Sequence, residues 1–328
     1  MKTDSATIKT GVIDTVKSQG PLVMLVVLCV IAGICFPAFA TSLNLVNISR
    51  QISMFGLLAL GMAFVILSGG IDLSVGSIAV VASIVALQAG RWFAPAAVVA
   101  PILVGVAIGA FNGALITWGG IPPFIATLAM MLGVKGLAFV LAGEGRSAAA
   151  AEQVVNVSGW FPVIFRGDCF GIPYPAIILI AALGVAVVVS KYTSFGRSVF
   201  AVGGSEEAAR MMGLNVNKCK MLVYMICGGC AGAAGLLLAS RLKAIDPTAT
   251  GGWELTAIAA VVIGGIPLTG GLGKIGHVIY GVLILGIIPN LINHLRISLP
   301  PWYNEMITGM LLLAVVLLQS LIAKRGTR

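Results

Sequence analysis

Apolar runs as long as a membrane-spanning helix recur along the whole chain, and this feature constrains its fold most. About 20 helical residues cross the ~30 Å hydrocarbon core of a bilayer. Of the 328 residues, 59% are apolar and only 9% are charged, whereas a soluble domain is about 25% charged. A membrane β-barrel would show alternating segments of ~10 residues, and the sequence has none of these. We therefore predict an all-α, polytopic bundle of membrane helices.

Ten apolar runs predict about ten transmembrane helices in one domain, 21–323. The predicted spans are 21–39, 51–68, 76–90, 94–117, 122–142, 173–190, 221–240, 253–267, 274–293 and 303–323. Short polar tails, 1–20 and 324–328, flank the domain, and two long connections, 143–172 and 191–220, interrupt it. A cleaved signal peptide is an alternative for the first run, but 1–20 is overlong for its charged region, so we expect a retained helix.

The basic residues predict the orientation of the bundle. The net charge is +9, but the basic residues are scattered in short loops, a pattern typical of membrane proteins and not of nucleic-acid binding. With both termini in the cytoplasm, the inner segments hold twelve basic residues and the outer segments seven. The bias places 143–172 outside and 191–220 inside. Lys135 lies within a span, near enough to its outer end to snorkel.

Glycines at four-residue spacing predict close helix packing. They form the series Gly105, Gly109 and Gly113 in one run and the pair Gly228 and Gly232 in another. Lipid supplies no hydrophobic drive for helix association, so small residues that let backbones approach become important.

Two glycine-rich segments resemble each other, Gly69-Gly-Ile-Asp-Leu-Ser-Val-Gly76 and Gly264-Gly-Ile-Pro-Leu-Thr-Gly-Gly271. Transporters often contain repeated halves whose broken helices meet at the substrate path. Two predicted spans separate the first segment from Ile121-Pro-Pro-Phe124, but only one separates the second from Leu299-Pro-Pro-Trp302. This local similarity thus favours matched helix breaks over a duplication of the whole half. The candidate helix-break residues are Gly69, Gly70, Gly76, Gly264, Gly265 and Gly271.

The 191–220 connection contains a short capped helix. Ser205 is a good N-cap, Glu206 and Glu207 oppose the positive end of the helix dipole, and Gly213 can end the helix in the left-handed conformation. We expect about seven helical residues, roughly 10 Å long, that present Met211, Met212 and Leu214. Such a helix either lies on the bilayer surface or docks in a groove of a partner, a task that flexible Met side chains suit.

At this loop the chain resembles the permease subunits of sugar ABC importers of the ribose/xylose/arabinose/galactose branch. The resemblance covers about residues 20–323 and rests on five segments: Gly69–Ser77, Phe124–Leu128, Phe195–Arg197, Gly203–Gly213 and Ile258–Gly273. It implies that a coupling loop contacts a cytoplasmic ABC ATPase through Ser205, Glu206, Glu207, Ala208, Ala209, Arg210, Met211, Met212, Gly213 and Leu214. Pro267 and Leu268 depart from the small or hydroxyl residues usual in the branch.

The resemblance also implies partners and a location. It implies a second permease copy, identical or paralogous, a periplasmic sugar-binding protein that contacts outer loops including 143–172, and the lipid of a bacterial inner membrane. ATP and magnesium are expected on the ATPase, with no cofactor on this chain. The sugar is expected to be ribose or a similar pentose or hexose, whose identity the permease sequence does not reveal.

Polar residues near or within the spans are candidates for the translocation path. Asp72 is either a functional intramembrane acid or a helix-cap acid that accepts from free N–H groups; a fixed acid suits a neutral sugar poorly. The other candidates either line the path or form interhelical hydrogen bonds, and they are Gln51, Asn112, Thr127, Asn290 and Asn293. Glu254 falls near a span end, where an interfacial position is the simplest interpretation.

No motif for energy conversion or catalysis is present. Gly273-Lys274 imitates a phosphate loop, but Leu268 and Ile275 replace its required glycine and hydroxyl residue. His277 and His294 lack further ligands nearby in sequence, so we expect neither a metal site nor catalytic residues. Two alternative functions predict other residues: an ion-coupled secondary transporter of a small polar solute would need paired intramembrane carboxylates, and an integral membrane enzyme would need clustered His, Asp or Glu.

Overall fold

The computed structural model describes residues 20–90, 93, 95–143, 153–154, 160–161, 163–294 and five positions between 303 and 313. Its long helices are α2 (Gly20–Cys35), α3 (Ser42–Leu67), α4 (Val75–Gly90), α5 (Ala96–Thr117), α6 (Pro123–Ala142), α8 (Tyr174–Tyr192), α11 (Val216–Leu242), α12 (Trp253–Ile263) and α13 (Val278–His294). The shorter ones are α7 (Val163–Arg166), α9 (Ser194–Gly204), α10 (Glu206–Met211) and the 3₁₀ turn η1 (Ile275–His277). Two antiparallel pairs, β1 (Gln153–Val154) with β4 (Ala244–Ile245) and β2 (Asp168–Cys169) with β3 (Ile172–Pro173), complete it.

The predicted class, a polytopic helical membrane protein, is confirmed. In the described part of the chain, six helices are long and apolar enough to cross a bilayer, and α2, α4 and α12 are shorter apolar helices. Helix α3 begins at Ser42, well before the predicted residue 51. The hydropathy pattern missed its first turns because they contain polar side chains. The predicted span 303–323 lies mostly outside the described residues, as do the two predicted tails.

Buried and exposed helices are arranged as lipid requires. The most apolar window of α3 is 83% buried, while those of α6 and α8 are 22% buried. Val26, Val30 and Ile34 on α2 are more than half exposed. A soluble protein could not stably leave such a face open to water. Helix α3 is therefore central, and α2, α6 and α8 present apolar side chains outward.

Close contact between α5 and α11 confirms the prediction from the glycine spacing. A Cβ added to Gly105 would lie 2.1 Å from the carbonyl oxygen of Gly228, and one added to Gly228 would lie 2.1 Å from that of Gly105. One turn away, a Cβ on Gly109 would lie 2.2 Å from the carbonyl oxygen of Tyr224. The two backbones touch directly, and the gap has no room for a methyl group.

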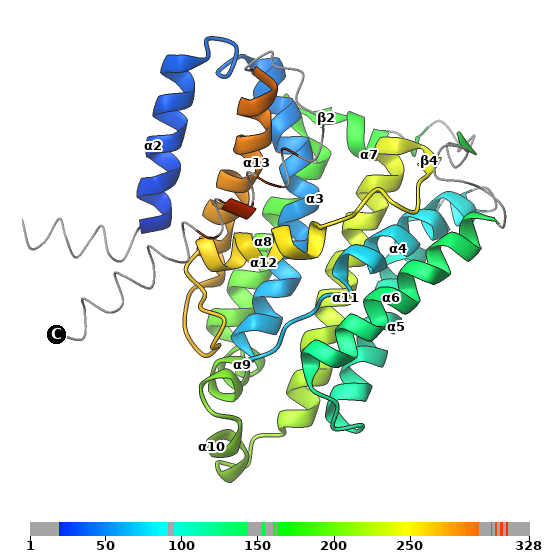
Figure 1. Ribbon diagram of the computed structural model, residues 1–328, viewed down its shortest axis with the longest axis vertical. Helices are drawn as coiled ribbons and strands as arrows, with labels where there is room; N and C mark the ends of the chain where they lie inside the picture. The colour runs from blue at the N-terminus through cyan, green and yellow to red at the C-terminus, as the bar shows by residue number, and fades with distance from the viewer. Residues whose placement is uncertain are drawn as a thin grey trace, which may run out of the picture.

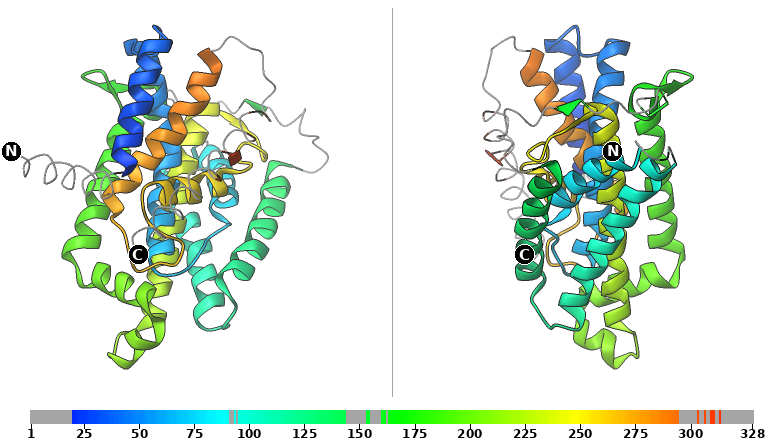
Figure 2. Two further views of the ribbon diagram at one scale, coloured as in Figure 1. Left: turned by 60° about the vertical axis from the view of Figure 1, so that its left-hand side comes forward. Right: turned by 90° about the vertical axis from the view of Figure 1, so that its right-hand side faces the viewer.

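The two long connections lie at opposite ends of the bundle (Figure 1). The segment with α9 and α10 projects below the membrane helices, whereas α7 and β2 of the 143–172 connection lie at the other end together with β4. The views in Figure 2 show the same projection of α10 beyond the bundle. Figure 1 also shows α12 lying across the bundle near mid-height rather than along it.

Candidate functional site

The segment from α9 to the start of α11 is built from three capped helices. Each helix follows a side chain that accepts a hydrogen bond from a backbone N–H of the first turn: Thr193 accepts from Gly196 at 3.1 Å, Ser205 from Ala208 at 3.2 Å and Asn215 from Lys218 at 2.9 Å. Such caps satisfy N–H groups that lack an intrahelical partner. The projecting segment therefore has a defined local structure.

Helix α10 ends in a Schellman motif, as its sequence suggests. Gly213 has a φ of +79°, its N–H donates to the carbonyl of Arg210, and the Leu214 N–H donates to that of Ala209. The chain turns back after Gly213, so Leu214 is half-buried against the hydrophobic core. The sequence predicts that Leu214 is presented together with the two methionines, and the structure shows it only partly exposed. Met211 and Met212 are 78% and 67% exposed.

Glu206 joins α10 to α11. Its carboxylate pairs with Arg210 one turn along α10, at 3.0 Å, and with Lys220 on α11. The hydrogen bond from Lys220, opposed by burial and aided by the hydrogen bond from Arg210, lowers the pKa of Glu206 below its ordinary value. The pairs hold the angle between the exposed methionines and α11, which enters the membrane.

Replacing Glu206 with Gln is expected to loosen α10 without unfolding the protein. Pairs this exposed contribute about 0.2–1 kcal/mol, so amide exchange in α10 should accelerate a few-fold at most at pH 7. Because the folded-state pKa is lowered, the stabilisation exists above the ordinary value of 4.5 and is lost as pH falls through the lowered pKa. Hydrogen exchange measured against pH checks this, and an equal difference at all pH values would contradict the ionic role.

Both glycine-rich segments end a helix by the same motif. At the end of α3, Gly69 has a φ of +80°, and the N–H groups of Gly69 and Gly70 donate to the carbonyls of Ile66 and Val65. At the end of α12, Gly265 has a φ of +91°, and the N–H groups of Gly265 and Ile266 donate to the carbonyls of Val262 and Val261. The left-handed glycines are thus Gly69 and Gly265. They differ by one position from the alignment of the two segments, which pairs Gly69 with Gly264.

These two segments meet the end of α9 in a contact that we call the glycine junction: residues 67–70, 203–204 and 270–271. The Gly271 N–H donates to the Leu67 carbonyl at 3.0 Å. A Cβ on Gly203 would lie 1.7 Å from that carbonyl oxygen and 2.6 Å from the Gly271 nitrogen, and one on Gly270 would lie 2.9 Å from the Gly69 nitrogen. Backbone therefore touches backbone where α9, which leads into α10, meets the end of α3 and the loop that follows α12.

Two further candidate helix-break residues, Gly76 and Gly264, lie at contacts between helices. Gly76 is the second residue of α4, so the first break ends before it. A Cβ there would lie 2.7 Å from Glu254 Oε2, and the glycine lets the start of α12 rest on α4. A Cβ on Gly264 would lie 2.8 Å from the Cα of Val278, so this glycine lets α12 approach α13.

Asp72, Asn112 and Thr127 occupy one fully buried polar cluster. Asp72 Oδ1 accepts from the backbone N–H and the hydroxyl of Ser74, at 2.9 and 2.6 Å, just before α4 begins. Asn112 donates to the Ser74 hydroxyl at 2.8 Å. The Thr127 hydroxyl lies 2.9 Å from the Pro123 carbonyl of its own helix and 3.3 Å from the Ile71 carbonyl. Asp72 thus makes the kind of local turn contact that a capping acid makes. A role for these residues in the path stays a prediction.

The remaining path candidates are dispersed. Asn290 on α13 exchanges two hydrogen bonds with Asn44 on α3, at 2.8 and 3.1 Å, and so forms an interhelical pair. Gln51 is half-buried on α3. The side chain of Asn293 lies outside the described residues. Among the described side chains, those of Gln51 and Asn290 are not part of the Asp72 cluster.

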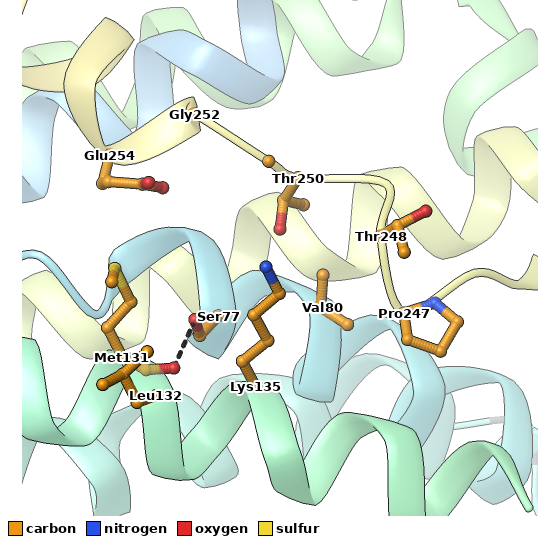
Figure 3. Close-up of a pocket in the computed structure, with 11 residues that line it drawn as sticks. Ser77, Val80, Met131, Leu132, Lys135, Pro247, Thr248, Thr250, Gly252 and Glu254 are labelled. Atoms are coloured by element: carbon orange, nitrogen blue, oxygen red, sulfur yellow. Dashed lines mark hydrogen bonds between the residues drawn. The ribbon is translucent and has the colours of Figure 1, made fainter. Parts of the chain in front are cut away.

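A polar cavity that sequence reasoning missed lies between α4, α6 and the segment 247–254 (Figure 3). Its volume is about 120 Å³, and Ser77, Lys135, Thr248, Thr250 and Glu254 are among its lining residues. Figure 3 shows the Lys135 side chain extending from α6 toward the opposite wall, where Thr250 and Glu254 lie. A lysine in the middle of an apolar run and an acid at the start of another were the available signals. Nothing in the sequence shows that the two runs meet.

Comparisons with known proteins agree with the resemblance expected from the motifs. A family model described as the permease component of a branched-chain amino acid transport system matches residues 44–316. The ribose import permease protein RbsC of Escherichia coli K12 is 39% identical over 307 residues, 92% of this chain and 93% of the relative. RbsC of Bacillus subtilis 168 is 40% identical over 303 residues, 91% of each chain. The L-arabinose transport system permease protein AraH of Escherichia coli K12 is 36% identical over 303 residues, 91% of this chain and 89% of the relative.

No solved structure gives a significant match. The family model nevertheless covers most of the chain, and the relatives align over nine-tenths of it. The chain therefore belongs to this family of transport-system permease components, and it is a multi-pass protein of the inner membrane.

Proposed function

We propose that this chain is the membrane-spanning permease subunit of a binding-protein-dependent ABC importer that carries a monosaccharide inward. The single observation that supports this best is α10, a capped and projecting helix with two exposed methionines at one end of a membrane bundle. A helix that presents apolar side chains outside the membrane suits a groove on a partner protein. The names of the most similar relatives favour a pentose or hexose as cargo.

The proposed mechanism couples the ATPase to the two interrupted helices. Closure of the ATPase on ATP moves α10, and the ion pairs of Glu206 pass part of this motion to α11. Helix α9 continues directly into α10 and touches the end of α3 and the loop after α12 at the glycine junction. Because these contacts join backbone to backbone with no flexible side chain between them, a shift of α9 moves the end of α3 and the loop that follows α12 together.

The proposed assembly contains three components besides this chain. A second permease copy, identical or paralogous, completes the path, and a cytoplasmic ABC ATPase binds ATP and magnesium and contacts Ser205–Leu214. A periplasmic sugar-binding protein delivers the sugar to the end where α7 and β4 lie, including the 143–172 connection. Both termini then lie in the cytoplasm, on the side of α10.

Sugar accumulation in cells tests the proposal. A bacterial strain without its own ribose, arabinose and allose importers would express this chain together with an ABC ATPase and a sugar-binding protein from the same organism. We expect labelled D-ribose, L-arabinose or D-allose to accumulate only when all three components are present. Accumulation of L-leucine instead, or of sugar without the ATPase, would contradict the proposed function.

A further inference from the structure

We infer that the cavity between α4, α6 and the segment 247–254 is a transient binding site for the transported polyhydroxylated solute. This inference deepens the proposed function and rests on it. The cavity is formed by three stretches of chain that are distant in sequence, as its lining residues show (Figure 3). The strand β4 leads directly into the segment 247–254, which forms one wall.

The lining of the cavity is rich in hydrogen-bond acceptors. Ser77 donates its hydroxyl proton to the Met131 carbonyl at 2.9 Å, and Thr250 donates to the Gly76 carbonyl at 2.8 Å. Thr248 donates to Asp246 at 2.7 Å. Each hydroxyl proton is therefore committed to the protein, while the oxygen lone pairs can still accept. Together with the Glu254 carboxylate, these oxygens suit a ligand that carries several O–H donors.

Lys135 supplies the complementary donor. It is exposed on α6, a helix apolar enough to span the membrane, and among the described residues it forms no ion pair within 4 Å, with Glu254 or any other acid. A lysine that faces lipid at this depth is costly, so charged residues in such helices usually face an aqueous cavity. The ammonium and the Glu254 carboxylate thus form no direct ion pair, although both line the same cavity.

The ligand class follows from the balance of donors and acceptors. A monosaccharide offers several hydroxyls that each donate and accept, which matches many acceptors and one ammonium. A zwitterionic amino acid would pair its carboxylate with Lys135 and its ammonium with Glu254, but it would leave the hydroxyl oxygens of Ser77, Thr248 and Thr250 without donors; L-leucine is therefore the competing ligand in the test. The volume of about 120 Å³ is below the ~300 Å³ of pockets that enclose a ligand. A small, open site suits a permease, because a transported solute must also leave.

Protection of an introduced thiol tests binding at this site. The variant Thr248→Cys places a thiol on the exposed cavity wall, and Cys35→Ser removes an exposed native thiol. Cys169 stays as an internal control, because it is exposed in β2, away from the cavity. In the reconstituted importer, excess D-ribose, L-arabinose or D-allose is expected to slow maleimide labelling of the introduced thiol at least about threefold, as mass action requires for an occupied site. Labelling of Cys169 should not change.

Removal of each charge tests the roles of Lys135 and Glu254 in binding. Lys135→Met and Glu254→Gln are each expected to abolish the protection and to lower sugar uptake about tenfold, the usual scale for a lost polar contact to a ligand. Both should still co-purify with the ATPase and show stimulated ATP hydrolysis. Lys243→Met, a lysine near the same end but outside the cavity, is the matched control and should transport normally.

The outcomes separate this inference from the proposed function. Sugar uptake by the unaltered importer with no sugar protection, or with full uptake in both charge variants, would overturn the inference and leave the proposed function standing. Protection by L-leucine but by no sugar would overturn the assigned ligand class. Absence of ATP-dependent sugar uptake in the unaltered importer would overturn the proposed function, and with it the inference. Protection by sugar and its loss in both charge variants supports the site.

Discussion

Gly203→Ala is expected to destabilise the permease by at least about 2 kcal/mol and to abolish transport, because its new methyl group would overlap the Leu67 carbonyl oxygen at 1.7 Å. Most glycine contacts can be relieved when a side chain rotates, but this one is backbone against backbone. The end of α9 would have to move away from α3 by more than 1 Å, and the Gly271 N–H lies on the same side. Thermal unfolding in detergent and uptake in vesicles measure the two effects.

Gly204→Ala is the matched control for this prediction. It lies at the same end of α9, yet a Cβ there meets no atom within 4 Å. Alanine is favoured over glycine in a helix by roughly 0.5–1 kcal/mol, so this variant should unfold at the same or a higher temperature. Equal effects of the two substitutions would show that α9 does not form the glycine junction.

Replacing both Met211 and Met212 with Asp is expected to uncouple the permease from its ATPase while leaving it folded. The two side chains are 78% and 67% exposed, so the substitutions cost little folding free energy. In a docked interface each buried anchor contributes about 2 kcal/mol or more. The affinity for the ATPase should then fall by at least about a hundredfold, which co-purification and titration of ATPase activity can measure.

The conservative variant with Leu at both positions serves as the control, since it keeps apolar volume without charge. It should retain ATPase binding within a few-fold. If the Asp variant still bound the ATPase normally, α10 would instead be a helix that lies on the bilayer surface, the alternative that the sequence left open. Binding of lipid vesicles by the isolated permease, lost in the Asp variant, would support that alternative.

Features encoded within a few residues could be predicted from the sequence. The N-cap Ser205 and the left-handed Gly213 determine α10 locally, and both have the predicted geometry. The close approach of Gly105 to Gly228 follows from small residues repeated at one helical turn. The boundaries of the spans were less predictable where polar residues extend a helix, as in the first turns of α3.

Features that depend on which helices meet could not be predicted. The similarity between the two glycine-rich segments indicated matched helix breaks. It did not indicate that Gly203 of α9 would contact both segments. Lys135 and Glu254 were interpreted separately, as a snorkelling lysine and an interfacial acid, because more than a hundred residues separate them in sequence. Which glycines are left-handed, Gly69 and Gly265, could be identified only from the backbone conformation and hydrogen bonds.

Transport in proteoliposomes tests most directly whether this permease depends on an ATPase partner. The permease and its ATPase would be reconstituted with ATP inside, and the sugar-loaded binding protein would be added outside. We predict uptake that requires ATP, the ATPase and the binding protein, and that continues when proton and sodium gradients are collapsed. Uptake by the permease alone, driven by either ion gradient, would contradict the account and identify an ion-coupled secondary transporter.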